Sequence, residues 1–276
     1  MASALGVNGP TKAFEAALAH DLWMADLMHG PSLRTAEGKV IHTRLFAILD
    51  DCSRLMVGAA YHAGEALACF LDVLRTAVAR RGIPFKLYVD QGKVFVSHHL
   101  RVVCASMGCK LLHAKPYAAW SKGKIERVFR TIQLDFQQRL AVSPVQGLEE
   151  LNRQFWSWLE LDYHQRMHRA LSTTPSARFA ERSTALRTVR DPAEMEAWFL
   201  MRRRRRVRKD ATLSLGGKLW EAPLELRGQE VEVRYNPFTW QPVDLYVKAR
   251  RIGPAKPCDK QLNVQLSNRA IHYANS

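Results

Sequence analysis

Three acidic residues, Asp26, Asp90 and Glu126, occupy positions from which carboxylates of separate elements can act together. Asp26 lies near the end of an apolar stretch predicted to be a strand (21–27), and Asp90 ends a second one, LYVD. Glu126 falls in the first turns of a predicted helix. Three such carboxylates suit Mg²⁺ or Mn²⁺, which prefer oxygen ligands. Two of these ions, held about 3.5–4 Å apart, can clamp the attacking and leaving oxygens of a phosphodiester displacement.

Other interpretations of the acidic residues remain open from the residues alone. Asp90 precedes Gln91 and Gly92, and an Asp two residues before a Gly is at home in a turn. Asp50 and Asp51, in the segment DDCS, are predicted to be turn formers for the same reason. His113 ends a further predicted strand, where contact with DNA or a carboxylate and simple packing are both reasonable roles.

The elements that must position these acids follow from hydrophobic periodicity. Three strands, joined by tight turns at HGPS and DCS, are followed by alternating helices and strands. The predicted strands are 21–27, 40–50, 54–62, 85–90 and 109–114, and the predicted helices begin near residues 65, 100, 124 and 148. This order predicts an α/β fold, a mixed five-stranded sheet covered by helices on both faces. The first and fourth strands would be neighbours where the strand order reverses, which is where ligand sites form.

The pattern changes after about residue 172. A run of five arginines, Arg202–Arg206, stands before short alternating segments (TLSL, KLWEA, QEVEVRY and DLYVK) that are separated by turn residues. These segments predict a small β-barrel. The arginine run is interpreted as an arm that follows DNA phosphates, with a solvated linker or a nuclear-import signal as alternatives.

Charge indicates the partner class. The chain of 276 residues carries 41 basic and 26 acidic groups, a net charge of +15, and residues 201–276 hold +9 of that excess. A concentrated basic end predicts nucleic-acid binding.

No apolar run approaches the roughly 18–20 residues that span a membrane, and the N-terminus shows no secretory signal. The five cysteines form no CxxC pair, which fits reduced thiols in a cytoplasm.

Several segments together resemble the DDE transposase and retroviral integrase superfamily. The segments are WMADLMHG with the first acid, FAILDDCSRLMVG, YVDQG with the second, HAKPYAAWSKGKIERVFRT with the third, and YHQRMHRALSTTP; 35 residues separate Asp90 from Glu126, the spacing typical of that superfamily. The likeness covers about residues 21–180, and the C-terminal segments resemble the barrel of phage Mu-type transposases. One departure is Gln133, where a basic residue is usual.

The resemblance implies a domain plan and an activity. The plan is a lead-in segment over 1–20, a ribonuclease H-like catalytic core over 21–180, a basic linker over 181–210 and a Mu-type β-barrel over 211–276. The implied activity is DNA cleavage and strand transfer in transposition, with two Mg²⁺ (or Mn²⁺) ions held by Asp26, Asp90 and Glu126. The expected DNA contacts are Lys115, Lys122, Lys124, Arg127, Arg130, Arg202, Arg203, Arg204, Arg205 and Arg206.

Partners and alternatives follow from the same resemblance. The partners would be transposon ends and target DNA, on which the chain would form a homo-oligomer in the bacterial cytoplasm at the nucleoid; whether an accessory ATPase takes part stays open. The helix-turn-helix region that precedes the core in relatives is not expected in the twenty residues before the first strand. The alternatives are an inactive or domesticated fragment that only binds DNA, and a nuclease that cuts without joining.

Overall fold

The computed structural model describes residues 15–34, 38–114 and 123–258. The chain divides into two compact units, Met1–Trp198 and Phe199–Ser276, and each is described by itself. In the described residues no helix is long and apolar enough to cross a bilayer.

The first unit alternates strands and helices in the predicted order. Its elements are β1 (Trp23–Arg34), β2 (Val40–Asp50), β3 (Met56–His62), α1 (Leu67–Arg81), β4 (Lys86–Val89), α2 (His98–Ser106), β5 (Lys110–His113), α3 (Gly123–Thr131), the π-helical turn η2 (Ile132–Phe136), α4 (Gln137–Val142), α5 (Leu148–Leu161), the short 3₁₀ turn η3 (Tyr163–Gln165), α6 (Pro175–Arg182) and α7 (Pro192–Phe199).

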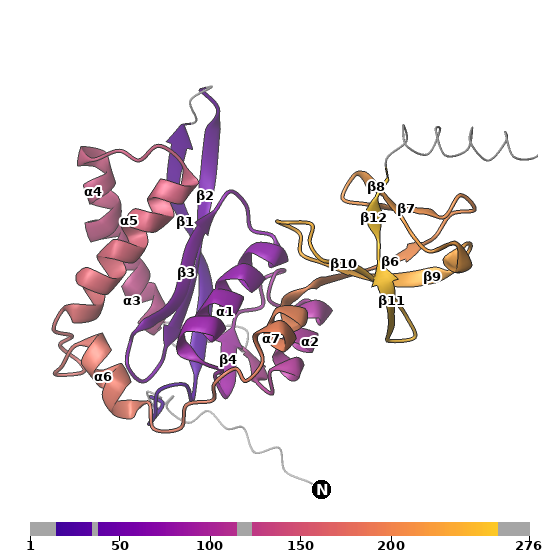
Figure 1. The fold of residues 1–276 in the computed structure, drawn as a ribbon. Helices are drawn as coiled ribbons and strands as arrows, with labels where there is room; N and C mark the ends of the chain where they lie inside the picture. The colour runs from indigo at the N-terminus through magenta and orange to yellow at the C-terminus, as the bar shows by residue number, and fades with distance from the viewer. Residues whose placement is uncertain (1–14, 35–37, 115–122, 259–276) are drawn as a thin grey trace, which may run out of the picture. The chain divides into compact units, whose positions relative to one another are not determined.

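The five strands form one mixed sheet in the order β3-β2-β1-β4-β5. β1, β2 and β3 pair antiparallel, whereas β4 joins β1 and β5 joins β4 in parallel. A parallel neighbour needs a crossover connection, and α1 and α2 supply the two crossovers. The predicted mixed five-stranded sheet is therefore confirmed (Figure 1).

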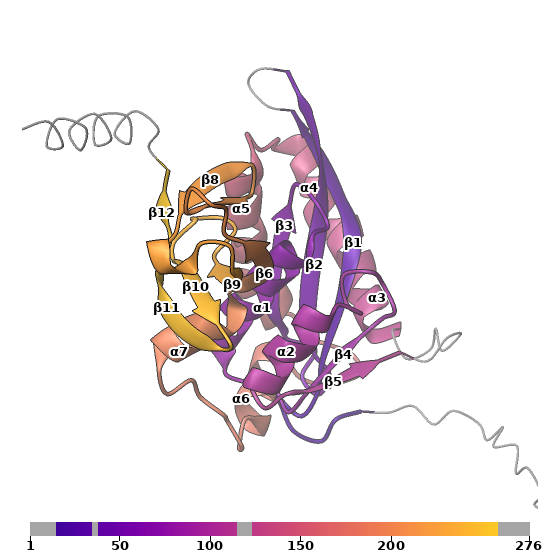
Figure 2. The same ribbon diagram turned by 90° about the vertical axis from the view of Figure 1, so that its right-hand side faces the viewer.

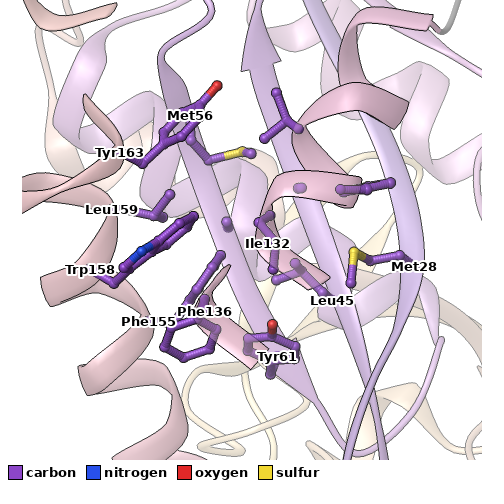
Figure 3. Packing of buried hydrophobic residues seen from close by; sticks show 14 of the residues in the cluster. Met28, Leu45, Met56, Tyr61, Ile132, Phe136, Phe155, Trp158, Leu159 and Tyr163 are labelled. Atoms are coloured by element: carbon purple, nitrogen blue, oxygen red, sulfur yellow. The ribbon is translucent and has the colours of Figure 1, made fainter. Parts of the chain in front are cut away.

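Strand alternation divides the core between the two faces of the sheet. In β2, Leu45, Ala47 and Leu49 belong to the cluster that packs against α3, η2 and α5. Figure 3 shows this cluster, in which Phe155 and Trp158 of α5 lie over the sheet. The intervening residues point the other way: Phe46 meets Phe70 of α1, with ring centroids 5.9 Å apart. Helices therefore cover both faces of the sheet, as strands with apolar residues on both faces require.

The predicted turn at HGPS (29–32) is wrong. β1 continues through Gly30 and Pro31 to Arg34, with an irregular register between His29 and Ser32, so that β1 and β2 form a long hairpin that extends past β3 (Figure 2). A bulge accommodates the proline, which cannot donate to the ladder. A side chain at Gly30 would meet Thr43 Oγ1, and it would lie 2.7 Å from ring carbons of Tyr61.

The second unit holds two small antiparallel sheets. The four-stranded sheet has the order β11-β10-β9-β6 and the three-stranded sheet β12-β8-β7. The strands are β6 (Met201–Arg206), β7 (Thr212–Leu215), β8 (Lys218–Glu221), β9 (Glu230–Tyr235), β10 (Val243–Val247), β11 (Arg250–Pro254) and β12 (Lys256–Pro257), with the 3₁₀ turn η4 (Leu224–Leu226) before β9.

The arginine run, expected inside a linker over 181–210, forms a strand instead. Arg202–Arg206 pair residue by residue with Arg234–Glu230 of β9, and α7 occupies part of the remaining segment. A strand accommodates five consecutive arginines because alternate side chains point to opposite faces, which separates the like charges.

Gly30→Ala should destabilise the first unit by about 1–3 kcal/mol, because Thr43 and Tyr61 are fully buried and leave no room for a methyl group. Gly64→Ala is the matched control, since nothing lies within 4 Å of a side chain placed there; its effect should stay within about 0.5 kcal/mol. Chemical denaturation of both variants measures the difference, and equal midpoints would contradict the packing described at Gly30.

Candidate active site

Asp26 and Asp90 occupy neighbouring positions at the centre of the sheet. The parallel register pairs Trp23 with Leu87 and Met24 with Tyr88. Continued by two residues, this register brings Asp26 level with Asp90, which directly follows β4. Adjacent strands lie about 4.8 Å apart and residues in register point to the same face. The topology therefore directs both carboxylates to one side of the sheet, where its antiparallel and parallel halves meet.

The loop after β4 holds Asp90 in a turn. The Asp90 carboxylate accepts a hydrogen bond of 2.7 Å from the Gly92 backbone N–H, and the Gln91 side-chain amide donates one of 3.0 Å to the Ala114 carbonyl. Asp90 is thus a turn residue, and the turn interpretation does not conflict with a site at the strand end. A Cβ atom at Gly92 would come within 2.8 Å of the Asp90 carboxylate oxygen, so the glycine leaves room for that oxygen.

Glu126 comes from the helix that covers the same face. α3 buries Ile125, Val128 and Phe129 in one cluster with Met28 of β1. Met28 is two residues from Asp26, so the Asp26 side chain points toward the α3 side of the sheet. Glu126 lies in the first turn of α3 and is exposed. All three acids accordingly belong to the side of the sheet that α3 covers.

The three acids do not form a preorganised metal site. Within the three described stretches of the chain, no group of three or more His, Cys, Asp or Glu residues is arranged to hold a metal ion. Asp26 also accepts a local hydrogen bond of 2.8 Å from the backbone N–H of Leu27.

Lys124 is bound to a buried acid. Its ammonium group lies 2.6 Å from the carboxylate of Asp51, which is 1% exposed. The second carboxylate oxygen of Asp51 accepts a hydrogen bond of 2.7 Å from the Ala16 backbone N–H. Burial lowers the pKa of Lys124, while the Asp51 carboxylate acts in the opposite direction. The pair ties the first turn of α3 to the turn between β2 and β3, two residues from Glu126.

The DDCS turn behaves as predicted, but it also has a tertiary role. The fully buried Asp50 accepts hydrogen bonds from the backbone and hydroxyl of Ser53, at 2.8 and 2.6 Å, and from the His20 backbone at 2.9 Å. Burial raises the pKa of Asp50, and the Ser53 hydroxyl partly offsets this. The ion pair of Asp51 with Lys124 could not be predicted from the sequence, because the two residues are 73 positions apart and meet only in the folded chain.

The remaining predicted DNA contacts have different surroundings. Arg127 and Arg130 are exposed on α3. By helical spacing, Arg130 shares the flank of Glu126, whereas Arg127 and Lys124 share another. Lys115 and Lys122 lie outside the described residues.

The five arginines of β6 are partly engaged within the second unit. Arg205 and Arg206 donate to the backbone carbonyls of Ser214 and Gly228, at 2.9 and 3.1 Å. Arg203 and Arg204 are exposed, and Arg204 lies 3.7 Å from the Glu230 carboxylate. Burial lowers the pKa of Arg202, and the charge of Arg234 adds to this.

His113 packs against the loop after β4. Its Nε2 lies 3.1 Å from the Phe95 carbonyl oxygen, so that this nitrogen donates. The contact ties the end of β5 to the segment that follows Asp90, which agrees with the packing alternative.

The sheet order and the helices on both faces define the class of the first unit: it has the ribonuclease H-like architecture of an integrase catalytic core. Residues 16–119 match the family described as the integrase core domain. A solved structure of the simian T-cell lymphotropic virus intasome, in complex with a PP2A regulatory subunit, is similar over 90% of this chain and 82% of that chain, with a TM-score of 0.54 and 14% identity. That likeness concerns the fold.

Two transposases are similar in sequence. The transposase for transposon Tn552 of Staphylococcus aureus is 29% identical over 187 residues, which are 60% of this chain and 38% of that protein. The transposase for insertion sequence IS1202 of Streptococcus pneumoniae is 25% identical over 131 residues, 43% of this chain and 28% of that protein. The chain thus matches less than half the length of these relatives. These matches support the predicted resemblance to the DDE transposase and retroviral integrase superfamily.

Lys124→Met should lower the stability of the first unit by about 1–3 kcal/mol, because it keeps the aliphatic stem but leaves the buried Asp51 carboxylate without its cation. Lys86→Met is the control: Lys86 is exposed, and no ion pair joins it to a described residue, so its effect should stay within about 0.5 kcal/mol. Urea unfolding measures both. Equal stability would mean that Lys124 is available for DNA, as the sequence predicted.

Proposed function

We propose that the chain carries the catalytic core of a DNA transposase that cleaves phosphodiester bonds and transfers DNA strands. The observation that supports this most is the β1–β4 register, which, extended by two residues, brings Asp26 level with Asp90 on the face covered by α3. The match to the integrase core domain family and the positive net charge of +15 support DNA as the substrate. Transposon ends and target DNA, bound by a homo-oligomer, are the proposed partners.

Asp26, Asp90 and Glu126 are the proposed ligands of two divalent ions. Their oxygen donors have the chemistry that Mg²⁺ and Mn²⁺ prefer. Asp26 lies within β1, and Asp90 directly follows β4. When bound, the ions would supply Lewis-acid activation and neutralise charge on the scissile phosphate. Glu126 is exposed on the first turn of its helix, so its long side chain has room to reach toward the two aspartates.

The reaction needs no covalent bond to the protein. Water attacks a phosphorus atom at the element's end, and the departing oxygen becomes a free 3′-hydroxyl. That hydroxyl then attacks a target phosphodiester in line, forming one P–O bond while another breaks. Arg130, on the flank of Glu126, and the exposed arginines of β6 would position phosphates without reading sequence. The same role for Lys115 and Lys122 rests on the sequence alone.

Asp90→Asn and Glu126→Gln should each reduce nicking of supercoiled DNA in Mg²⁺ or Mn²⁺ by orders of magnitude, because each removes a charged oxygen ligand but nearly keeps the side-chain shape. Glu149→Gln is a close control for Glu126→Gln: Glu149 is also an exposed glutamate in the first turn of a helix. It should cut like the wild type. DNA affinity is measured in parallel.

The outcomes separate the candidate roles. Loss of cutting at both acids with retained DNA binding is the expected result. Equal cutting by the wild type, the two variants of the acids and the Glu149→Gln control would refute the metal role of Asp90 and Glu126. Binding without cutting by the wild type would favour the inactive fragment, and cutting without strand transfer from pre-nicked ends would favour a nuclease.

Gly92→Ala should impair cutting while leaving the fold intact. A methyl group there would come within 2.8 Å of the Asp90 carboxylate oxygen, and that oxygen is the end of a movable side chain. The carboxylate therefore shifts at a cost of about 1 kcal/mol or less, but a displaced ligand lowers activity by about tenfold or more. Thermal unfolding measures the stability of the variant, and the nicking assay measures its cutting activity. Unchanged nicking would argue against a catalytic position for Asp90.

A further inference from the structure

A cavity of about 740 Å³ lies beside α3, away from the flank that carries Glu126. Lys124, Arg127 and Thr131 of α3 line it, at the spacing of one helix flank. Glu126 and Arg130 do not belong to its lining. The cavity is of the size that accommodates small organic ligands, about 300–1,000 Å³.

The floor of the cavity is apolar. It is formed by one row of residues across three strands, because Met24 of β1 pairs with Tyr88 of β4, and Tyr88 with Leu112 of β5. α3 and α5 cover this face of the sheet over β1, β2 and β3. Tyr88 and Leu112 remain partly exposed, so this part of the face offers apolar surface to a ligand.

A buried guanidinium with a spare donor lines the same cavity. Arg54 is only 6% exposed, and its Nη2 donates to the Glu15 carboxylate at 2.8 Å. Its Nη1 is buried and has no hydrogen-bond partner in the described structure. A buried donor of a charged group that stays unsatisfied costs free energy, which an anion in the cavity would recover.

Further cations surround the cavity. Lys86 and Lys110 face each other in the parallel register of β4 and β5, and like charges in that position repel. His168 also lines the cavity, and its Nδ1 is buried without a partner in the described residues. Burial, Arg54 and Arg127 lower the pKa of His168, in this order. Among the described residues of the lining, Asp51 is the only acid, and it is paired with Lys124.

We propose that this cavity binds an amphipathic organic anion, an aromatic or branched aliphatic body that ends in a carboxylate or a phosphate. The body lies on Met24, Tyr88 and Leu112, and the anionic group accepts hydrogen bonds from Arg54 Nη1 and from Arg127. None of the three acids lines the cavity, so the inference does not depend on the proposed function. A ligand there would contact α3, the helix that carries Glu126.

Three probes that share one ring system test the proposal by calorimetry on the full chain: 1-naphthoate, 1-naphthyl phosphate and the uncharged 1-naphthol. One molecule of an anionic probe should bind per chain, about tenfold or more tightly than 1-naphthol, as expected for a charge-assisted hydrogen bond in a buried site. The tighter of the two anions identifies the preferred head group. Equal affinity for all three probes, or no binding by either anion, would overturn the proposal.

Variants locate the binding. Arg54→Met and Arg127→Met should each weaken the anionic probes by about tenfold and leave 1-naphthol nearly unchanged. Arg153→Met is the control, because Arg153 is an exposed arginine of α5 that does not line the cavity. Arg127 is exposed, so its replacement tests the site even if Arg54→Met unfolds the chain. Unchanged anion affinity in Arg127→Met, or an equal loss in Arg153→Met, would contradict the assignment.

Discussion

The parallel pairing of β1 with β4 is the contact on which the remaining structure depends. It joins an antiparallel hairpin sheet to a parallel pair, and it rests on the register of Trp23 with Leu87 and Met24 with Tyr88. A shift of one residue would turn Asp90 to the opposite face of the sheet from Asp26. The buried Trp23 and Leu87 fix that register, because both are fully enclosed on the face covered by α1 and α2.

α3 is held by two kinds of contact with different physical bases. Ile125, Val128 and Phe129 hold it by burial against the sheet. An ion pair with the buried Asp51 holds its first turn. On the flank away from Glu126 lies the cation-lined cavity. A ligand in the cavity would contact the helix on this flank.

The second unit uses its arginines for both structure and charge. Pairing with β9 satisfies the backbone of the arginine run, and the side chains of Arg205 and Arg206 bond to carbonyl groups nearby. The exposed side chains of Arg203 and Arg204 then present positive charge from a fixed strand instead of a mobile segment. A strand loses less conformational entropy when it binds phosphates than a flexible arm does.

The sequence by itself determined the order of elements and the mixed sheet, because hydrophobic periodicity and turn residues are local signals; the role of the three acids stays a prediction. The buried runs of β2 and α1 show this. Tertiary structure alone decided that β1 passes through Pro31, that Arg202–Arg206 form a strand and that Lys124 turns to Asp51. Each of these depends on a partner distant in sequence: β2 for Pro31, β9 for the arginines, and a carboxylate 73 residues away for Lys124. Burial of Arg54 is likewise invisible in a local pattern, since an arginine is usually exposed.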